Sequence, residues 1–211
     1  MANYVLTLNT FHPEPSLRLA AEVLAEGGLE GALCGRLAVW HYVEDWQEQV
    51  QTEDVDIAIR WQDAAPVREI LTARGFSPID LPFGGVGVRS DDRMVALDFM
   101  HRRSERYGDL GGLFASALEA RLGGVLRGGQ FLDVVRPEHL VVMKFVTGRD
   151  TDRDDIVRIL NATAVDMERT RELARLHAGP GGLSLFERFL FETGHPAAYE
   201  RRFESKPWWR R

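Results

Sequence analysis

The segment Asp54-Val55-Asp56-Ile57-Ala58-Ile59 decides the expected fold, because its side chains alternate with the period of two that is typical of a β-strand. In a strand, Asp54 and Asp56 point to the same face, roughly 7 Å apart at the backbone. The apolar residues between and after them would face the core. Two neighbouring carboxylates repel each other, and a divalent cation such as magnesium relieves that repulsion. The alternative is a solvated strand face without a metal.

A third carboxylate lies within residues 94–100, Met-Val-Ala-Leu-Asp-Phe-Met, which are otherwise apolar and predict a second strand. The carboxylate of Asp98 needs a partner or a role there, since burying an unpaired charge is costly. If this strand lies beside that of Asp54 and Asp56, the three acids converge on one patch. Such a cluster can hold two metal ions and support in-line displacement at phosphorus.

Upstream of the acids, residues 31–34 form a short apolar run that predicts a buried strand, and Gly35 follows it. Residues 37–43 then suit a buried helix. The start of a helix offers free backbone N–H groups and the positive end of its dipole, and glycine permits a phosphate to approach closely. A plain tight turn also explains Gly35, but together with the acids it suggests an anion cradle beside a metal clamp.

The rest of the chain predicts an α+β fold, with a mixed front followed by a helical back. Further strands are expected at residues 4–8, 83–90, 93–100 and 131–135, and the second and third of these would form a hairpin. Helices are expected at residues 16–26 with Ser16 as N-cap, 64–74, 137–147, 152–161, 166–176, and 184–193 with a Ser184–Glu187 capping box. We therefore expect an α/β core over residues 1–135 and a helical lobe over residues 136–211, packed on that core.

Composition is ordinary for a globular protein: the 211 residues are 45% hydrophobic and 27% charged. The net charge of −6 argues against broad nonspecific binding to nucleic acid. No apolar stretch is long enough to span a bilayer, and the N-terminus lacks the pattern of a signal peptide. Cys34 is the single cysteine, so an intrachain disulfide is impossible. These features predict a cytoplasmic protein without a membrane partner.

The ordered motifs resemble those of the nucleotidyltransferase superfamily that includes DNA polymerase beta. The residues concerned are Leu33-Cys34-Gly35-Arg36-Leu37-Ala38-Val39, Thr52-Glu53-Asp54-Val55-Asp56-Ile57 and Leu97-Asp98-Phe99. The closer likeness is to small bacterial members such as the AbiEii-type toxins, and it covers about residues 33–160. It implies a nucleotidyltransferase-like mixed sheet flanked by helices, with a C-terminal helical lobe.

The resemblance also implies roles for individual residues. Asp54, Asp56 and Asp98 would bind magnesium, with two ions expected, and Asp98 would also be the candidate base. Nucleotide would be bound by Gly35, Arg36, Thr52 and Lys144. The lysine lies in residues 136–145, which look like the lysine-bearing helix of such proteins, and residues 152–156 look like the Arg- and Asp-rich segment after it. A surface salt bridge from Lys144 to Asp152 or Asp155 is the alternative for that lysine.

One position departs from the family pattern, because Arg36 stands where a second small residue is usual. It would either obstruct the phosphate cradle or add a positive charge to it. The sequence thus predicts a magnesium-dependent enzyme that moves an NMP from an NTP to a hydroxyl on RNA, protein or a small molecule. By resemblance it is toxin-like, with an antitoxin protein as a candidate partner. The alternatives are a catalytically degenerate fold that serves as a binding or regulatory module, and an unrelated α/β protein.

Overall fold

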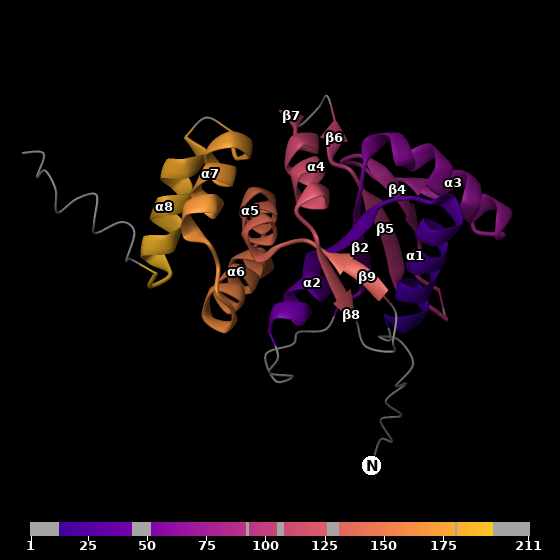
Figure 1. Cartoon of the computed structure of the whole chain (residues 1–211), viewed down its shortest axis with the longest axis horizontal. Coiled ribbons are helices and arrows are strands. Elements are labelled where there is room, and N and C mark those ends of the chain that lie inside the picture. Colours follow the sequence, from indigo (N-terminus) through magenta and orange to yellow (C-terminus); the bar gives the residue numbers. More distant parts are fainter. Residues whose placement is uncertain are drawn as a thin grey trace, which may run out of the picture.

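A computed structural model describes residues 13–43, 52–91, 93–104, 108–125, 131–179 and 181–195. Their main feature is a seven-stranded mixed sheet in the order β3-β4-β5-β2-β1-β9-β8, with helices on both of its faces (Figure 1). The predicted strand at residues 4–8 lies outside the described residues. Within those residues, no helix is long and apolar enough to cross a membrane.

The strands of the sheet are short, and the central ones are rich in buried apolar residues. Their bounds are β1 Gly31–Cys34, β2 Asp54–Ile59, β3 Ile79–Asp80, β4 Gly85–Val88, β5 Ala96–Met100, β8 Leu122–Val125 and β9 Phe131–Val134. The pairs β2–β5 and β1–β9 are parallel, and the other neighbours in the sheet are antiparallel. A separate hairpin joins β6 Arg103–Ser104 to β7 Gly108–Asp109.

Helices cover the two faces because the central strands are apolar on both. Helix α1 (Glu14–Gly27) and helix α3 (Ala64–Ala73) pack against each other and against strands β4 and β5. Helix α2 (Gly35–Tyr42) and helix α4 (Gly111–Glu119) pack on β2, with α4 on the face to which Asp56 points. Figure 1 shows α1 and α3 on one side of the sheet and α4 on the other.

Four helices follow the last strand: α5 Pro137–Thr147, α6 Asp150–Ala162, α7 Met167–His177 and α8 Gly182–Glu192. They lie together on the side of the molecule away from α1 and α3, drawn in orange and yellow in Figure 1. Helix α5 packs on α6 and α7, and α2 contacts both α5 and α6. The division of the chain at residue 135 into a core and a lobe stays a prediction.

Several predicted elements match the structure closely, including β2 and α5, and the predicted hairpin is the antiparallel pair β4–β5. Two predicted caps are wrong. Pro13 is the N-cap of α1, and the buried Ser16 hydroxyl instead donates a 2.8 Å hydrogen bond to the Val95 carbonyl oxygen. Gly181, with a positive φ of 77°, precedes α8, so Ser184 lies inside that helix.

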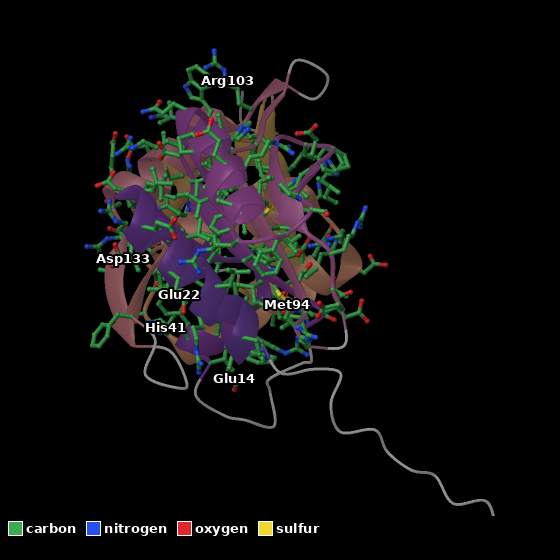
Figure 2. The ribbon with its side chains drawn as sticks, turned by 90° about the vertical axis from the view of Figure 1, so that its right-hand side faces the viewer. Glu14, Glu22, His41, Met94, Arg103 and Asp133 are labelled. Atoms are coloured by element: carbon green, nitrogen blue, oxygen red, sulfur yellow. The ribbon has the colours of Figure 1, made fainter. Side chains whose placement is uncertain are left out.

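The Ser16–Val95 hydrogen bond ties the first turn of α1 to the chain just before β5, and Figure 2 shows the neighbouring Glu14 and Met94 at the same end of the molecule. We expect Ser16→Ala to lower the free energy of unfolding by about 1–2 kcal/mol, because a buried hydrogen bond is lost. Chemical denaturation measures this. Ser77→Ala, at an exposed position, is the control and should change stability by less than about 0.5 kcal/mol. Equal effects of the two substitutions would contradict the importance of this bond.

Candidate active site

The register of the sheet brings the predicted acids together. Strands β2 and β5 are parallel neighbours, and in this pairing Asp56 lies opposite Asp98 while Asp54 lies opposite Ala96. On the other side of β2, Asp56 pairs with Cys34, the last residue of β1. All three carboxylates are partly buried. The sheet therefore places the acids at neighbouring positions, as the sequence predicted.

Two glycines make room for the two central carboxylates. Gly35 begins α2 with a φ of 65°, and a Cβ atom there would overlap the Asp56 carboxylate, 2.7 Å from its Cγ. Gly87 of β4 lies opposite Asp98, and a Cβ atom there would overlap Asp98 Oδ1. Glycine is thus required at both positions for the acids to sit where they do.

The electrostatics of the cluster favour protons or a cation. Burial and the nearby charges of Asp54 and Asp98 raise the pKa of Asp56 to about 7, against the opposing effect of Lys144 and Arg102. Burial and Asp54 likewise raise the pKa of Asp98 to about 6. A divalent cation between the carboxylates would reduce this repulsion.

The acids suit magnesium as a partial ligand set. In the described part of the chain, no group of three or more His, Cys, Asp and Glu side chains is already arranged to hold a metal ion. Magnesium commonly takes one or two carboxylates and completes its shell with water and substrate phosphates. Clustered carboxylates are hard oxygen donors of this kind, so Asp54, Asp56 and Asp98 are candidate ligands that need the phosphates of a substrate to complete the site.

A pocket opens beside Asp56 and Gly35, between the sheet and the helices that follow it. Three cationic side chains line it: Arg102 after β5, Lys144 on α5 and Arg149 before α6. Apolar side chains from β5, α4 and α5 form much of the remaining wall, namely Met100, Leu113, Phe114, Leu140 and Met143. The pocket thus combines acids, cations and an apolar wall, which is the usual make-up of a small-molecule site.

Lys144 is held by two buried acids. Its Nζ lies 3.0 Å from Asp152 Oδ1 and 2.8 Å from Asp155 Oδ2, and its side chain is 5% exposed. The predicted alternative, a salt bridge, is therefore present with both acids, but it is buried rather than on the surface. Burial raises the pKa of Asp152, and hydrogen bonds and charge from Arg149 and Lys144 outweigh that effect, so the net pKa is lowered. Lys144 nevertheless still lines the pocket.

Arg36 and Thr52 make contacts that the sequence did not specify. The Nε atom of Arg36 lies 3.3 Å from Asp155 Oδ2, so its guanidinium is directed at α6. The buried Thr52 hydroxyl lies 3.1 Å from Asp54 Oδ1 and 3.0 Å from the Asp54 carbonyl oxygen, and so helps to orient Asp54. Nucleotide binding by Arg36 and Thr52 stays a prediction.

Three residues near the site escaped the sequence analysis: Gly87, Arg102 and Arg149. A glycine inside an apolar strand is a signal of close approach, and Gly87 could have been found that way. Arg149 Nε lies 3.0 Å from Asp152 Oδ2, and its place just after the lysine helix was a weaker hint. Arg102 belongs to a group of arginines after a predicted strand, which is typical of a solvated face, and nothing in the sequence indicates that its side chain turns toward the acids.

The overlap between Gly35 and Asp56 predicts a specific stability effect. Gly28 has a similar φ of 59° with nothing within 4 Å of its Cβ position, so Gly28→Ala reports backbone strain alone, about 1–2 kcal/mol. Gly35→Ala should lower the free energy of unfolding further, by about 3 kcal/mol or more, because it also displaces the Asp56 carboxylate. Denaturant titration of both variants compares them. Similar losses would mean that the carboxylate moves aside freely.

The raised pKa of Asp56 makes stability depend on pH. In the unfolded chain the carboxyl titrates near 3.8, so the native state binds more protons between about pH 4 and 7, and its stability falls as pH rises through that window. Asp56→Asn should remove this loss and, in EDTA at pH 8, raise the free energy of unfolding by an amount on the order of 2 kcal/mol.

Thermal unfolding from pH 5 to pH 8, compared between the variant and the wild type, tests this expectation. The variant and the wild type have to be compared at each pH because His139 also titrates. Burial lowers the pKa of His139 to about 4, so its contribution to stability rises with pH in both proteins. Asp154→Asn, at an exposed position on α6, is the matched control. An Asp56→Asn variant less stable than the wild type at pH 8 would show that the charged carboxylate stabilises the fold.

No protein-family model matches the chain, and the search of curated proteins gives no match. The solution structure of the antibiotic-resistance factor ANT(2″)-Ia aligns over 92% of this chain and 96% of that one, with 14% identity and a TM-score of 0.52. A crystal structure of ANT(2″)-Ia in complex with adenylyl-2″-tobramycin aligns over 75% and 94% of the two chains, with 14% identity and a TM-score of 0.51. The α+β fold of this chain, a mixed sheet flanked by helices, is thus the fold of the nucleotidyltransferases.

Proposed function

We propose that this chain is a magnesium-dependent nucleotidyltransferase that moves an NMP from an NTP to a hydroxyl group of a small molecule. The observation that carries the proposal is the pairing of Asp56 with Asp98 on adjacent parallel strands, where Gly35 and Gly87 leave space for their carboxylates. Two acids are costly to place side by side in a partly buried position. A cation bound together with a phosphate chain offsets that cost.

The three acids have two proposed roles, metal binding and proton acceptance. Asp54 and Asp56, with Asp98, would hold magnesium, which would supply positive charge to the phosphates of the NTP. Asp98 has a pKa of about 6, so at pH 7.5 it is ionised and close enough to neutral pH to accept a proton. The acceptor oxygen forms a bond to the α-phosphorus, the α–β P–O bond breaks, pyrophosphate leaves, and the hydroxyl proton passes to Asp98.

The cations of the pocket supply the second half of the site. Lys144 and Arg149 line the same pocket as Asp56, and Asp152 contacts both of them. A positioned ammonium and guanidinium stabilise the negative charge of a triphosphate and of the leaving pyrophosphate. Asp152 holds these two donors in place before the nucleotide arrives, which reduces the entropy lost on binding.

Two observations support a small acceptor. The complex of ANT(2″)-Ia contains an adenylylated tobramycin, a small molecule, on a chain of the same fold. The apolar wall formed by Leu113, Phe114 and Leu140 also suits a compact ligand. RNA and protein acceptors remain sequence-based alternatives, as does the toxin-like role with its antitoxin partner.

A second candidate function is a degenerate fold that binds a ligand without transfer. The observation that favours it is that the ammonium of Lys144 is already paired with the carboxylates of Asp152 and Asp155. Arg36 is likewise paired with Asp155. In that case nucleotide would bind weakly or not at all, and no product would form.

The proposed function predicts metal-dependent nucleotide binding. Calorimetry with ATP should give binding in magnesium and at least about tenfold weaker binding in EDTA, since the acids repel the triphosphate without the metal. Asp56→Asn should abolish the magnesium effect, whereas Asp154→Asn on the exposed face of α6 should leave it unchanged.

Transfer itself is measured with an α-labelled NTP and a panel of small hydroxyl compounds, by following label in the acceptor and release of pyrophosphate. Label transfer that depends on magnesium and on Asp98 supports the enzyme. Magnesium-dependent binding without transfer to any acceptor supports the degenerate module. Binding that is equal in wild type and Asp56→Asn would remove these acids from the nucleotide site.

A further inference from the structure

Arg102 has an unusual backbone conformation for its residue type. It follows β5, the strand of Asp98, with a φ of 51°, and no other non-glycine residue in the described part of the chain has a positive φ. An arginine in the left-handed region is strained, since its Cβ approaches the backbone closely. Such strain persists where a side chain has to be aimed in a particular direction, and it is frequent at binding sites.

Arg102 forms no ion pair with an acid among the described residues, although its charge acts on Asp56 and Asp98 from further away. Its guanidinium makes two weak contacts: Nη2 lies 3.0 Å from Met100 Sδ, and the guanidinium carbon lies 5.2 Å from the centre of the Phe83 ring. A thioether is a poor acceptor and an aromatic ring leaves the charge uncompensated. The two other cations of the pocket, Lys144 and Arg149, are both paired with buried Asp152.

The side chain of Arg102 is nevertheless half-buried and faces the pocket. It lines that pocket together with Gly35, Asp56 and Lys144. Its positive charge is close enough to lower the pKa of both Asp56 and Asp98. The pocket is therefore lined by one guanidinium without an ion pair, which follows a strand of the sheet, and by two paired cations from α5 and the start of α6.

We propose that Arg102 binds an anionic group, a phosphate or a carboxylate, of a ligand in this pocket. The inference rests on the proposed function in that the ligand is either the NTP or its acceptor. A guanidinium grips such groups through two parallel hydrogen bonds, which a methionine sulfur and a phenyl ring cannot replace. The anionic group belongs either to the triphosphate of the donor nucleotide or to an acceptor that carries a phosphate or carboxylate beside its hydroxyl.

Two substitutions separate binding from folding. Arg102→Gln removes the charge and the fork of donors. Arg102→Gly removes them too, but glycine adopts a φ of 51° without strain, so this variant should unfold at the same temperature as the wild type or a higher one. The matched control is Arg103→Gln, because Arg103 lies over the Trp61 ring, 4.7 Å from its centre, and projects outward at one end of the molecule (Figure 2).

Calorimetry with three probes identifies the source of the anionic group. Inorganic triphosphate and magnesium–ATP measure binding at the site of the donor nucleotide. Glycerol 3-phosphate measures binding at the site of an anionic acceptor, and it is added to protein that is saturated with magnesium and a non-hydrolysable ATP analogue. We expect both Arg102 variants to bind at least one probe about tenfold more weakly, while Arg103→Gln binds like the wild type. Weaker binding of triphosphate and ATP assigns Arg102 to the donor, and weaker binding of glycerol 3-phosphate alone assigns it to the acceptor.

Three results would overturn the proposal: wild-type protein that binds none of the probes, affinities that change less than twofold in both Arg102 variants, and an Arg102→Gly variant that unfolds at a clearly lower temperature. In the last case the side chain is structural. Failure of the proposed function looks different, since Arg102-dependent binding of triphosphate would persist while no label is transferred to any acceptor. The two ideas can therefore fail separately.

Discussion

The repulsion among Asp54, Asp56 and Asp98 is the constraint around which this part of the molecule is built. Parallel pairing of β2 with β5 places two of these carboxylates side by side in partly buried positions. Isolated charges there would destabilise the fold, and burial together with the neighbouring acids raises the pKa of Asp56 and Asp98. Gly35 and Gly87 leave space for the pair of carboxylates, and the cations that line the pocket partly offset their negative charge.

A second set of acids organises the positive charges. Asp152 and Asp155, each 1% exposed, lie on α6 and contact four cations: Arg36 on α2, Lys144 on α5, Arg149 at the start of α6, and Arg158 on α6 itself. Buried ion pairs of this kind add little net stability, but removing one partner is costly. Their main effect is to fix α2, α5 and α6 relative to one another beside Asp56.

The sequence predicted the elements that have a local pattern of residues, but it did not predict features that depend on tertiary contacts. The alternation at residues 54–59 and the apolar periodicity at residues 137–147 were sufficient to predict β2 and α5. Strand β8 was missed because two of its four residues are glycines, which have weak strand propensity, and α4 was missed although most of its residues after two initial glycines are good helix formers. Ser16 was assigned to a cap, whereas its hydroxyl bonds to Val95, a residue far away in the chain. The acids could be predicted as a cluster, but the left-handed turn at Arg102 could not.

The order of the strands has a consequence for how the protein reaches its native state. Helix α3 and the β3–β4 hairpin lie between β2 and β5 in the sequence. The pairing that brings Asp56 and Asp98 together is therefore long-range rather than local. Loop closure makes such pairings slow, and here the last approach also brings like charges together. Above neutral pH, where both carboxylates are charged, docking of β5 on β2 is therefore the step of refolding that this repulsion should slow.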